Sequence, residues 1–144
     1  MNLKNKKVLI TGATGGIGNS LVEKFNSLGA IVVASGTNEE KLNNLQKKFS
    51  NIYIEQFKLD QHDKIEKFIE KIDQKLEGLD ILVNNAGIAM DKLSIRLSEE
   101  NWKKVLDLNL TSTFLMCKFA IKKMLKKKYG KIINITSIVG HTGN

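Results

Sequence analysis

Short apolar segments alternate with longer amphipathic segments along the whole chain. The short segments are rich in Val, Leu and Ile and predict strands, at residues 7–11, 31–35, 52–59, 79–83 and 131–136. The longer segments repeat apolar residues at helical spacing and predict helices, at residues 16–28, 39–49, 64–76 and 99–128. Strands that alternate with helices form a parallel sheet, and strands this apolar indicate helices on both faces. The sequence therefore predicts an α/β fold, a doubly wound parallel sheet of about five strands, in one domain spanning residues 1–144.

The composition fits a soluble globular protein. Hydrophobic residues make up 42% and charged residues 26% of the 144 residues, and apolar segments recur from end to end, which excludes a disordered chain. No stretch is long or apolar enough to span a bilayer. The apolar run at residues 8–10, which follows the basic residues near the amino terminus, is too short for a signal peptide. We therefore expect a cytoplasmic protein that does not bind membranes.

The net charge of +8 comes almost entirely from lysine, because Arg96 is the only arginine. Proteins that bind nucleic acids favour arginine for phosphate and base contacts, and this chain has no basic segment interleaved with aromatic residues. We therefore expect no nucleic acid partner. Cys117, His62 and His141 are too widely spaced for a metal-binding pattern, so we expect no metal, and a single cysteine excludes an internal disulfide bond.

A glycine-rich segment joins the first predicted strand to the first predicted helix. A phosphate needs exposed backbone N–H groups at a helix amino terminus, and glycine lets the main chain approach it closely. Glycine at such a turn can also serve packing alone, but a position in the first strand–helix unit favours dinucleotide binding. The candidate binding residues are Gly12, Ala13, Thr14, Gly15, Gly16, Ile17 and Gly18.

This segment resembles the glycine-rich motif of the short-chain dehydrogenase/reductase family, and the resemblance extends through the chain. Asn84-Asn85-Ala86-Gly87 follows the fourth predicted strand, as the family's Asn-Asn-Ala-Gly motif does. The resemblance implies a Rossmann-type, NAD(P)-binding domain. It implies cofactor binding for Asn85, Ala86 and Gly87, adenine contact for Asp60, catalysis for Asn109 and Ser137, and a structural role for Asn84.

The residues after the second predicted strand bear on the choice of nicotinamide cofactor. An acidic side chain there would hydrogen-bond the ribose and repel a 2′-phosphate. Gly36 occupies the position of the family's Asp, and Thr37 can donate a hydrogen bond to a phosphate. Many relatives that prefer NADP carry an arginine where this chain has Gly15, and the lack of that arginine argues against NADP(H). On balance we expect NADP(H).

Two further segments resemble the bacterial 3-oxoacyl-[acyl-carrier-protein] reductase subfamily. They are residues 85–102 and residues 128–140. This resemblance implies NADPH-dependent reduction of a 3-oxoacyl thioester to the 3-hydroxyacyl thioester in fatty-acid biosynthesis, by a homotetramer. It also implies that the acidic acyl carrier protein docks on a basic patch around Lys128. The alternative for this patch, which includes Lys122, Lys123, Lys126 and Lys127, is a solvated helix end whose cations complement the helix dipole.

The family's chemistry depends on a Tyr-x-x-x-Lys pair that follows the catalytic serine. Phe57 stands four residues after Tyr53, and Ile133 stands four residues after Tyr129, so neither tyrosine of the 144 residues forms the pair. We interpret the chain as an incomplete copy, truncated before this motif and inactive by itself. Two alternatives remain open. One is another short-chain reductase that acts on a small ketone or alcohol, and the other is a non-catalytic NADP(H)-binding protein.

Overall fold

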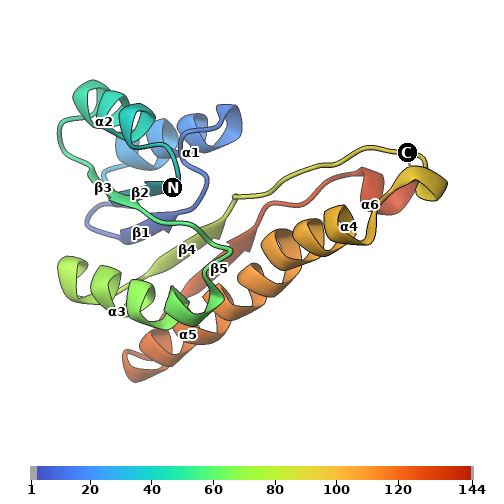
Figure 1. Ribbon diagram of the computed structural model, residues 1–144. Coiled ribbons are helices and arrows are strands. Elements are labelled where there is room, and N and C mark those ends of the chain that lie inside the picture. Colours follow the sequence, from blue (N-terminus) through green and yellow to red (C-terminus); the bar gives the residue numbers. More distant parts are fainter. Residues whose placement is uncertain (1–2, 144) are drawn as a thin grey trace.

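The structure of the protein is a computed structural model that describes residues 3–143. Its centre is a parallel sheet with the strand order β3-β2-β1-β4-β5 (Figure 1). The order reverses between β1 and β4, as in doubly wound Rossmann-type sheets. The predicted fold class is therefore confirmed. The strands are β1 (Lys7–Ile10), β2 (Ile31–Gly36), β3 (Tyr53–Gln56), β4 (Ile81–Asn84) and β5 (Lys131–Asn134).

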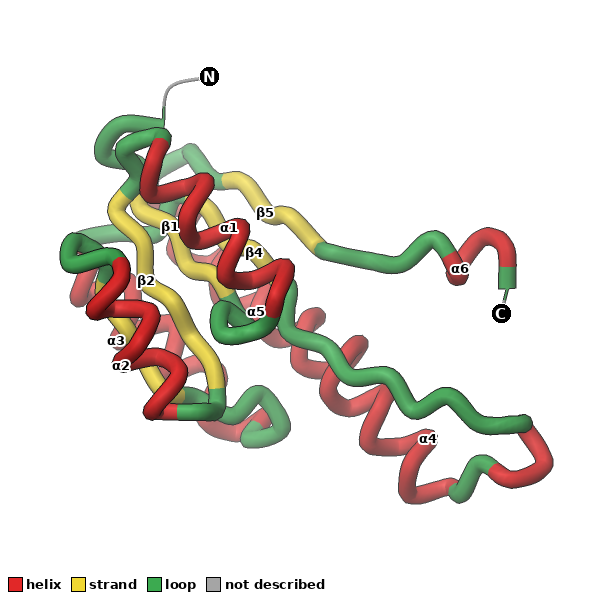
Figure 2. The backbone as a smooth tube through the Cα atoms, turned by 90° about the horizontal axis from the view of Figure 1, so that it is seen from above, coloured by secondary structure: helices red, strands yellow, loops and turns green. Residues whose placement is uncertain are grey.

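Helices cover both faces of the sheet. One core cluster lies between the sheet and helices α1 and α2, and a second lies between the sheet and helices α3 and α5 (Figures 1 and 2). The α-helices are α1 (Gly16–Ser27), α2 (Glu39–Lys48), α3 (Ile65–Leu76), α4 (Glu99–Leu106), α5 (Ser112–Lys126) and α6 (Val139–Thr142). Short 3₁₀ segments, η1 (His62–Lys64) and η2 (Ser94–Arg96), precede α3 and α4.

The alternation of side chains along the strands explains why the central strands are apolar throughout. In β1, Val8 and Ile10 enter the core on the α1 side, whereas Leu9 enters the core on the α3 side. In β4, Val83 enters the core on the α1 side and Leu82 enters the core on the α3 side. Successive side chains of a strand point to opposite faces, so a strand covered on both sides must be apolar at every position.

The predicted helix over residues 99–128 is wrong as a single α-helix. Its start is correct, because the side chain of Ser98 accepts a hydrogen bond from the N–H of Asn101, 3.2 Å away, and so caps α4. The helix then widens into a π-helical segment, η3 (Asp107–Thr111), before α5 begins. The Ser112 hydroxyl donates to the carbonyl of Leu108 and so competes for the backbone acceptors at this point.

The third and fifth strands are shorter than predicted, and one short helix was missed. The fifth strand was expected over residues 131–136, but β5 ends at Asn134. The third strand was expected over residues 52–59, but β3 pairs with β2 only from Tyr53 to Gln56. As an edge strand it ends where its one neighbour ends, at Gly36. The short helix α6 was not predicted, because four residues carry too little periodicity to be recognised.

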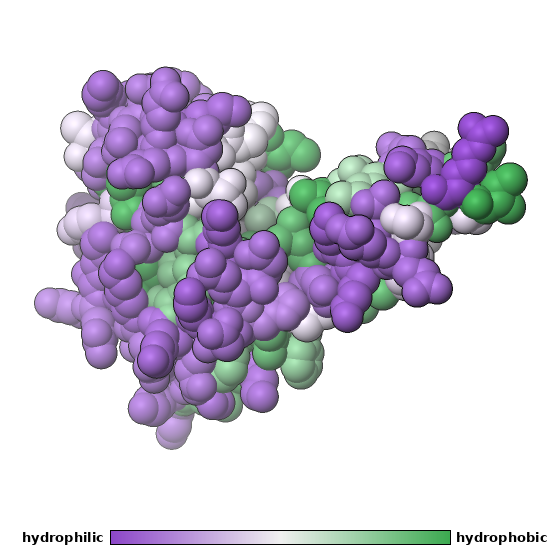
Figure 3. Space-filling model, in the orientation of Figure 1, coloured by the Kyte–Doolittle hydropathy of each residue, from purple (hydrophilic) through white to green (hydrophobic). Residues whose placement is uncertain are grey.

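Part of the chain projects from the body of the fold. This part consists of α4, the loop before it and the segment after β5, and Figure 2 shows that the segment after β5 diverges from α4. Large apolar side chains are exposed on it, including Ile95, Trp102 and Ile138. Figure 3 shows hydrophobic surface on this projecting part. Within residues 3–143, no helix combines the length and the apolar character needed to cross a bilayer.

Asp80 joins three elements at the amino ends of the strands. Its carboxylate accepts a hydrogen bond from Lys127 Nζ, 2.6 Å from Oδ1, and one from the backbone N–H of Lys7, 3.0 Å from Oδ2. Burial favours the neutral carboxyl, but the contacts with Lys127 and Lys7 outweigh burial and lower the pKa of Asp80 below its ordinary value. The contact therefore ties the end of α5 to β1 and β4.

Replacing Asp80 by Asn should lower the free energy of unfolding at neutral pH by about 1–2 kcal/mol, because a charge-assisted hydrogen bond becomes a neutral one. The pKa of Asp80 is lower in the folded chain than in the unfolded chain. The stabilisation is therefore complete above the unfolded-state pKa of about 3.9 and is lost as the pH falls through the folded-state pKa. Urea unfolding of both proteins at pH 7 and in acid measures this difference.

Glu100→Gln is the matched control, because Glu100 forms an exposed pair with Lys104 in α4 and such pairs contribute little. A difference between wild type and Asp80→Asn that is the same in acid as at pH 7 would contradict the assignment of the stabilisation to this carboxylate.

Candidate functional site

Two loops meet at the point where the strand order reverses. The loop after β1 contains the glycine-rich segment, and the loop after β4 contains Asn85, Ala86 and Gly87. Because β1 and β4 are parallel neighbours, both loops leave the same edge of the sheet. Such a switch point opens a crevice beyond the carboxyl ends of the strands, where ligands bind in open α/β folds.

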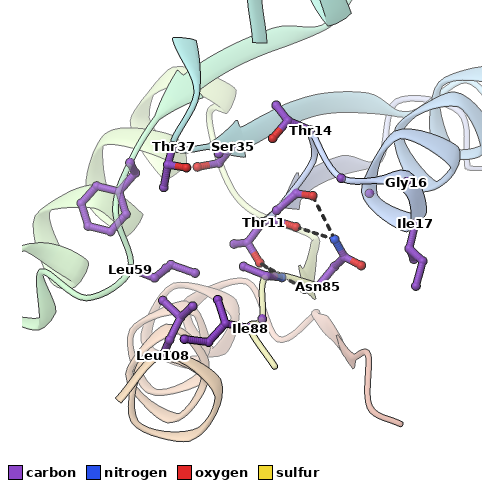
Figure 4. Close-up of a pocket in the computed structure, with 17 residues that line it drawn as sticks. Thr11, Thr14, Gly16, Ile17, Ser35, Thr37, Leu59, Asn85, Ile88 and Leu108 are labelled. Atoms are coloured by element: carbon purple, nitrogen blue, oxygen red, sulfur yellow. Dashed lines mark hydrogen bonds between the residues drawn. The ribbon is translucent and has the colours of Figure 1, made fainter. Parts of the chain in front are cut away.

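Hydrogen bonds between Thr11 and Asn85 hold the two loops together. The buried Thr11 hydroxyl donates to the carbonyl of Val83 at 3.3 Å and accepts from the backbone N–H groups of Asn85 and Ala86, each at 3.1 Å. In return, the Asn85 side-chain amide donates to the carbonyls of Thr11 at 3.0 Å and Gly12 at 3.1 Å. These contacts fix the backbone of both loops before any ligand binds (Figure 4).

Glycine is required at two positions of the first loop and not at two others. Gly12 has a φ of 62°, and a Cβ there would lie 2.8 Å from Ala86 Cα. A Cβ on Gly18 would lie 2.1 Å from the Gly12 carbonyl oxygen. By contrast, a Cβ on Gly15 would meet only the Gly12 oxygen at 3.5 Å, and one on Gly16 would meet nothing within 4 Å. The loop is therefore tight on its protein side and open on its outer side.

A cavity of about 450 Å³ lies over these loops, within the range of small-molecule sites. In Figure 4, Ser35 and Thr37 lie along one side, and Leu59, Ile88 and Leu108 gather along another. The lining residues are Thr11, Gly12, Thr14, Gly15, Gly16, Ile17, Gly18, Ser35, Gly36, Thr37, Phe57, Leu59, Asn85, Ala86, Gly87, Ile88 and Leu108.

Most of the residues expected to bind a cofactor line this cavity. The exceptions are Ala13 and Asp60. Ala13 is buried behind the loop, where its N–H donates to the carbonyl of Ser35 at 2.9 Å. Asp60 is exposed and lies in the turn after β3, and it is not among the lining residues. Its expected contact with adenine stays a prediction.

The apolar lining residues Phe57, Leu59 and Leu108 were not identified from the sequence. They belong to no glycine or asparagine motif. The one available signal is position, since Phe57 and Leu59 follow the carboxyl end of a parallel strand.

Asn109 lies in η3 and not in regular α-helix. Its side chain holds Ile88, in the loop after β4, by both the backbone N–H and the backbone carbonyl. Asn109 Oδ1 accepts from the Ile88 N–H at 2.9 Å, and Asn109 Nδ2 donates to the Ile88 carbonyl at 2.8 Å. Asn109 does not line the cavity itself, but Leu108 beside it does.

Ser137 lies in the exposed segment beyond β5. Its hydroxyl accepts a long hydrogen bond of 3.4 Å from the N–H of Val139, at the start of α6. It does not line the cavity, and within residues 3–143 no hydrogen bond joins it to Asn109. Both residues expected to be catalytic thus lie beyond the carboxyl ends of β4 and β5, and no hydrogen bond between them holds one relative to the other.

Asn84 and Cys117 have structural surroundings. The Asn84 side chain donates to Asn134 Oδ1 at 2.8 Å and to the Cys117 sulfur at 3.3 Å, which joins β4 to β5 and α5. Burial raises the pKa of the Cys117 thiol, against the opposing effect of the Asn84 hydrogen bond. This cysteine is therefore protonated at neutral pH and a poor nucleophile.

The lysine cluster at the end of α5 lies at the opposite end of the sheet from the cavity. The Lys127–Asp80 contact places it beside the amino ends of β1 and β4, whereas the cavity lies beyond their carboxyl ends. Three of its five lysines are paired with carboxylates, in Lys122–Glu66, Lys123–Glu70 and Lys127–Asp80. The basic patch is therefore not beside this chain's own cavity.

Comparison with known proteins agrees with this geometry. Residues 6–144 match the family model described as short chain dehydrogenase. The chain is 41% identical to a 3-oxoacyl-[acyl-carrier-protein] reductase of Aquifex aeolicus and 46% identical to one of Rickettsia conorii, in each case over all of this chain and 60% or 58% of the relative. It is 41% identical to nodulation protein G of a Rhizobium species, over 99% of this chain and 58% of the relative. The chain thus spans about three-fifths of the length of these curated relatives.

The contrast between Gly18 and Gly16 predicts opposite outcomes for the same substitution. Gly18→Ala should lower the free energy of unfolding by about 3 kcal/mol or prevent folding, because its Cβ overlaps the Gly12 carbonyl. Gly16→Ala should change it by less than about 1 kcal/mol, since the added methyl enters open space on a helical residue. Chemical denaturation of the two variants provides the comparison, and equal effects would contradict the loop geometry.

Proposed function

The chain belongs to the short-chain dehydrogenase family, and we propose that its cavity binds NADP(H). We further propose that the protein to which these residues belong reduces a 3-oxoacyl-[acyl-carrier-protein] thioester to the 3-hydroxyacyl thioester in fatty-acid biosynthesis. The observation that carries the proposal is the cavity at the switch point, which combines a glycine-rich helix start with the Asn85 loop. Two of the relatives named above are called 3-oxoacyl-[acyl-carrier-protein] reductases.

The start of α1 supports binding of the cofactor's diphosphate. Its N-cap, Gly15, has no side chain to accept from the first-turn N–H groups. The outer side of the loop is open at Gly15 and Gly16. Unpaired N–H groups at the positive end of a helix dipole, approached without steric hindrance, suit an anion.

The end of β2 supports NADP(H) over NAD(H). Gly36 is buried at the position where an acidic side chain would repel a 2′-phosphate, and Thr37 lines the cavity beside it. The Asn38 side chain caps α2, where its Oδ1 accepts from the Lys41 N–H at 2.8 Å. The Thr37 hydroxyl can donate a hydrogen bond to a 2′-phosphate in the cavity. Gly15 leaves space for a phosphate but supplies no cation to it.

The proposed chemistry divides between the cofactor and the chain. Bound NADPH supplies a hydride. On the chain, Asn109 fixes Ile88 at the wall of the cavity, and one lone pair of Asn109 Oδ1 stays available to a water of the proton relay. Ser137, beyond β5, is the residue we assign to orienting the substrate carbonyl.

We further propose that the acyl carrier protein carries the substrate and docks on the basic patch around Lys128. We also propose that the complete enzyme works as a homotetramer. Lys126 and Lys128 support the docking, because neither forms an ion pair within residues 3–143. A patch at the far end of the sheet cannot guide a thioester to this chain's own cavity at short range. Docking there therefore serves a neighbouring subunit.

A second candidate is a protein that binds NADP(H) without turnover. It would need only the cavity and its glycine-rich loop, which these residues form. A reductase that acts on another small ketone is a further candidate in the same fold, because the apolar lining of the cavity does not select the substrate.

Binding of NADPH and NADH, followed by fluorescence, tests the cofactor assignment. The wild-type chain should bind NADPH more tightly than NADH. Gly36→Asp should weaken NADPH binding by about tenfold or more without weakening NADH binding, because a carboxylate then faces the 2′-phosphate. Gly36→Ala is the control, since any Cβ there lies 3.2 Å from Thr14 Oγ1 and displaces that side chain. Equal losses in both variants would refute the electrostatic explanation.

A turnover assay tests the assignment of the general acid. With acetoacetyl thioester as substrate, the chain should bind NADPH but not oxidise it above the rate in buffer, because no Tyr-x-x-x-Lys pair is present to protonate the substrate oxygen. A small free ketone should give the same result. Turnover of the thioester would show that another group donates the proton, and turnover of the ketone alone would favour the other reductase class.

A further inference from the structure

A hydrogen bond links the segment after β3 to the π-helical segment η3. His62 Nε2 lies 3.0 Å from the backbone oxygen of Asp107, at a half-buried position, although 45 residues separate them in sequence. A carbonyl oxygen only accepts, so His62 Nε2 must carry the hydrogen and donate it. This contact therefore fixes the tautomer of the neutral imidazole.

The acceptor, Asp107, begins the segment that shapes one wall of the cavity. Its carbonyl also accepts the wide i to i+5 hydrogen bond from the Ser112 N–H that defines the π turn. Leu108, the next residue, lines the cavity, and Asn109 holds both backbone atoms of Ile88. Any shift of Asp107 is therefore transmitted to two parts of the wall.

The donor follows a neighbouring stretch of the cavity lining. His62 begins η1, just after the stretch in which Phe57 and Leu59 line the cavity. Leu59 lies on the same side of the cavity as Leu108 (Figure 4). The His62 ring thus joins the segment after β3 to η3, and no other side-chain hydrogen bond joins these two segments within residues 3–143.

We propose that His62 is a positioning residue of the cofactor site. Its hydrogen bond to the Asp107 carbonyl holds the π turn in the conformation that directs Leu108 to the cavity and Asn109 to Ile88. The contact within the chain does not depend on the proposed function. Only the expected effect of His62 on cofactor affinity rests on the proposed function.

Two amide variants separate the hydrogen bond from the bulk of the ring. In His62→Gln, the side-chain nitrogen reaches the place of Nε2 and can donate to Asp107. In His62→Asn, the nitrogen falls at the place of Nδ1 and cannot reach the carbonyl. Both variants are polar and uncharged, so rescue by Gln and not by Asn reports the donated hydrogen bond itself.

The first measurement is hydrogen exchange of the Ile88 amide by NMR, in the full chain without cofactor. His62→Asn should speed this exchange about fivefold, while His62→Gln stays within about twofold of wild type. In an Asn109→Ala background, His62→Asn should produce no further change, because the effect travels through Asn109. Nitrogen chemical shifts of the wild-type ring should show the hydrogen on Nε2. A hydrogen on Nδ1, or equal exchange in Asn and wild type, overturns the proposal.

The second measurement is affinity for NADPH. His62→Asn should weaken binding about threefold to tenfold, and His62→Gln should restore it. If the Ile88 exchange responds as expected but no variant and no wild-type chain binds NADPH, the proposed function fails and the positioning role of His62 stands. If the chain binds NADPH but affinity and exchange are the same in all three proteins, the role of His62 is refuted and the proposed function stands.

Discussion

The hydrogen bonds of the Thr11 hydroxyl are the interaction on which the rest of the site depends. Parallel neighbours such as β1 and β4 are joined only as far as their ladder extends, and their following helices cover opposite faces of the sheet. Beyond Thr11, whose N–H still donates to the Val83 carbonyl at 3.0 Å, the two strands would separate. The buried Thr11 hydroxyl, which donates once and accepts twice, holds them together, and the Asn85 side chain adds two further hydrogen bonds. The crevice above it is therefore rigid on the side that would hold the phosphates.

The site contains a firmly held part and a loosely held part. The glycine loop is packed between Ser35, Ala86 and the start of α1, so its conformation follows from the sheet. Ser137 is on an exposed segment, residues 137–143, whose hydrogen bonds within the described part of the chain join only neighbours in that segment. Asn109 occupies an intermediate position, since both atoms of its side-chain amide are used to hold Ile88. The proposed cofactor site is thus held by contacts among these residues, whereas no hydrogen bond within residues 3–143 joins the two proposed catalytic residues.

Sequence patterns predicted the secondary-structure elements that depend on burial and the loop that depends on glycine. They missed the features that arise where side chains bind helix carbonyls in competition with backbone N–H groups. Apolar strands, amphipathic helices and the start of the helix at residue 99 are set by neighbours a few residues away, so they were found. The π turn arises where the Ser112 hydroxyl and the distant His62 ring both bind helix carbonyls, and no periodicity in the sequence reports a partner 45 residues away. Leu108, in the same segment, was therefore not identified from the sequence as part of the wall of the cavity.

Sheet polarity also limits what the positive charge can do. A helix that crosses back antiparallel to its strands must end near their amino ends, so the cations at the end of α5 are carried away from the cavity by topology alone. Glu66, Glu70 and Asp80 then neutralise three of those cations, and the pKa of Glu66 is lowered by its hydrogen bond to Lys122. The field that remains acts from the surface, where it falls off over about 8–10 Å in physiological salt. An acidic partner drawn to Lys126 and Lys128 therefore meets the end of the sheet opposite the cavity of the same chain.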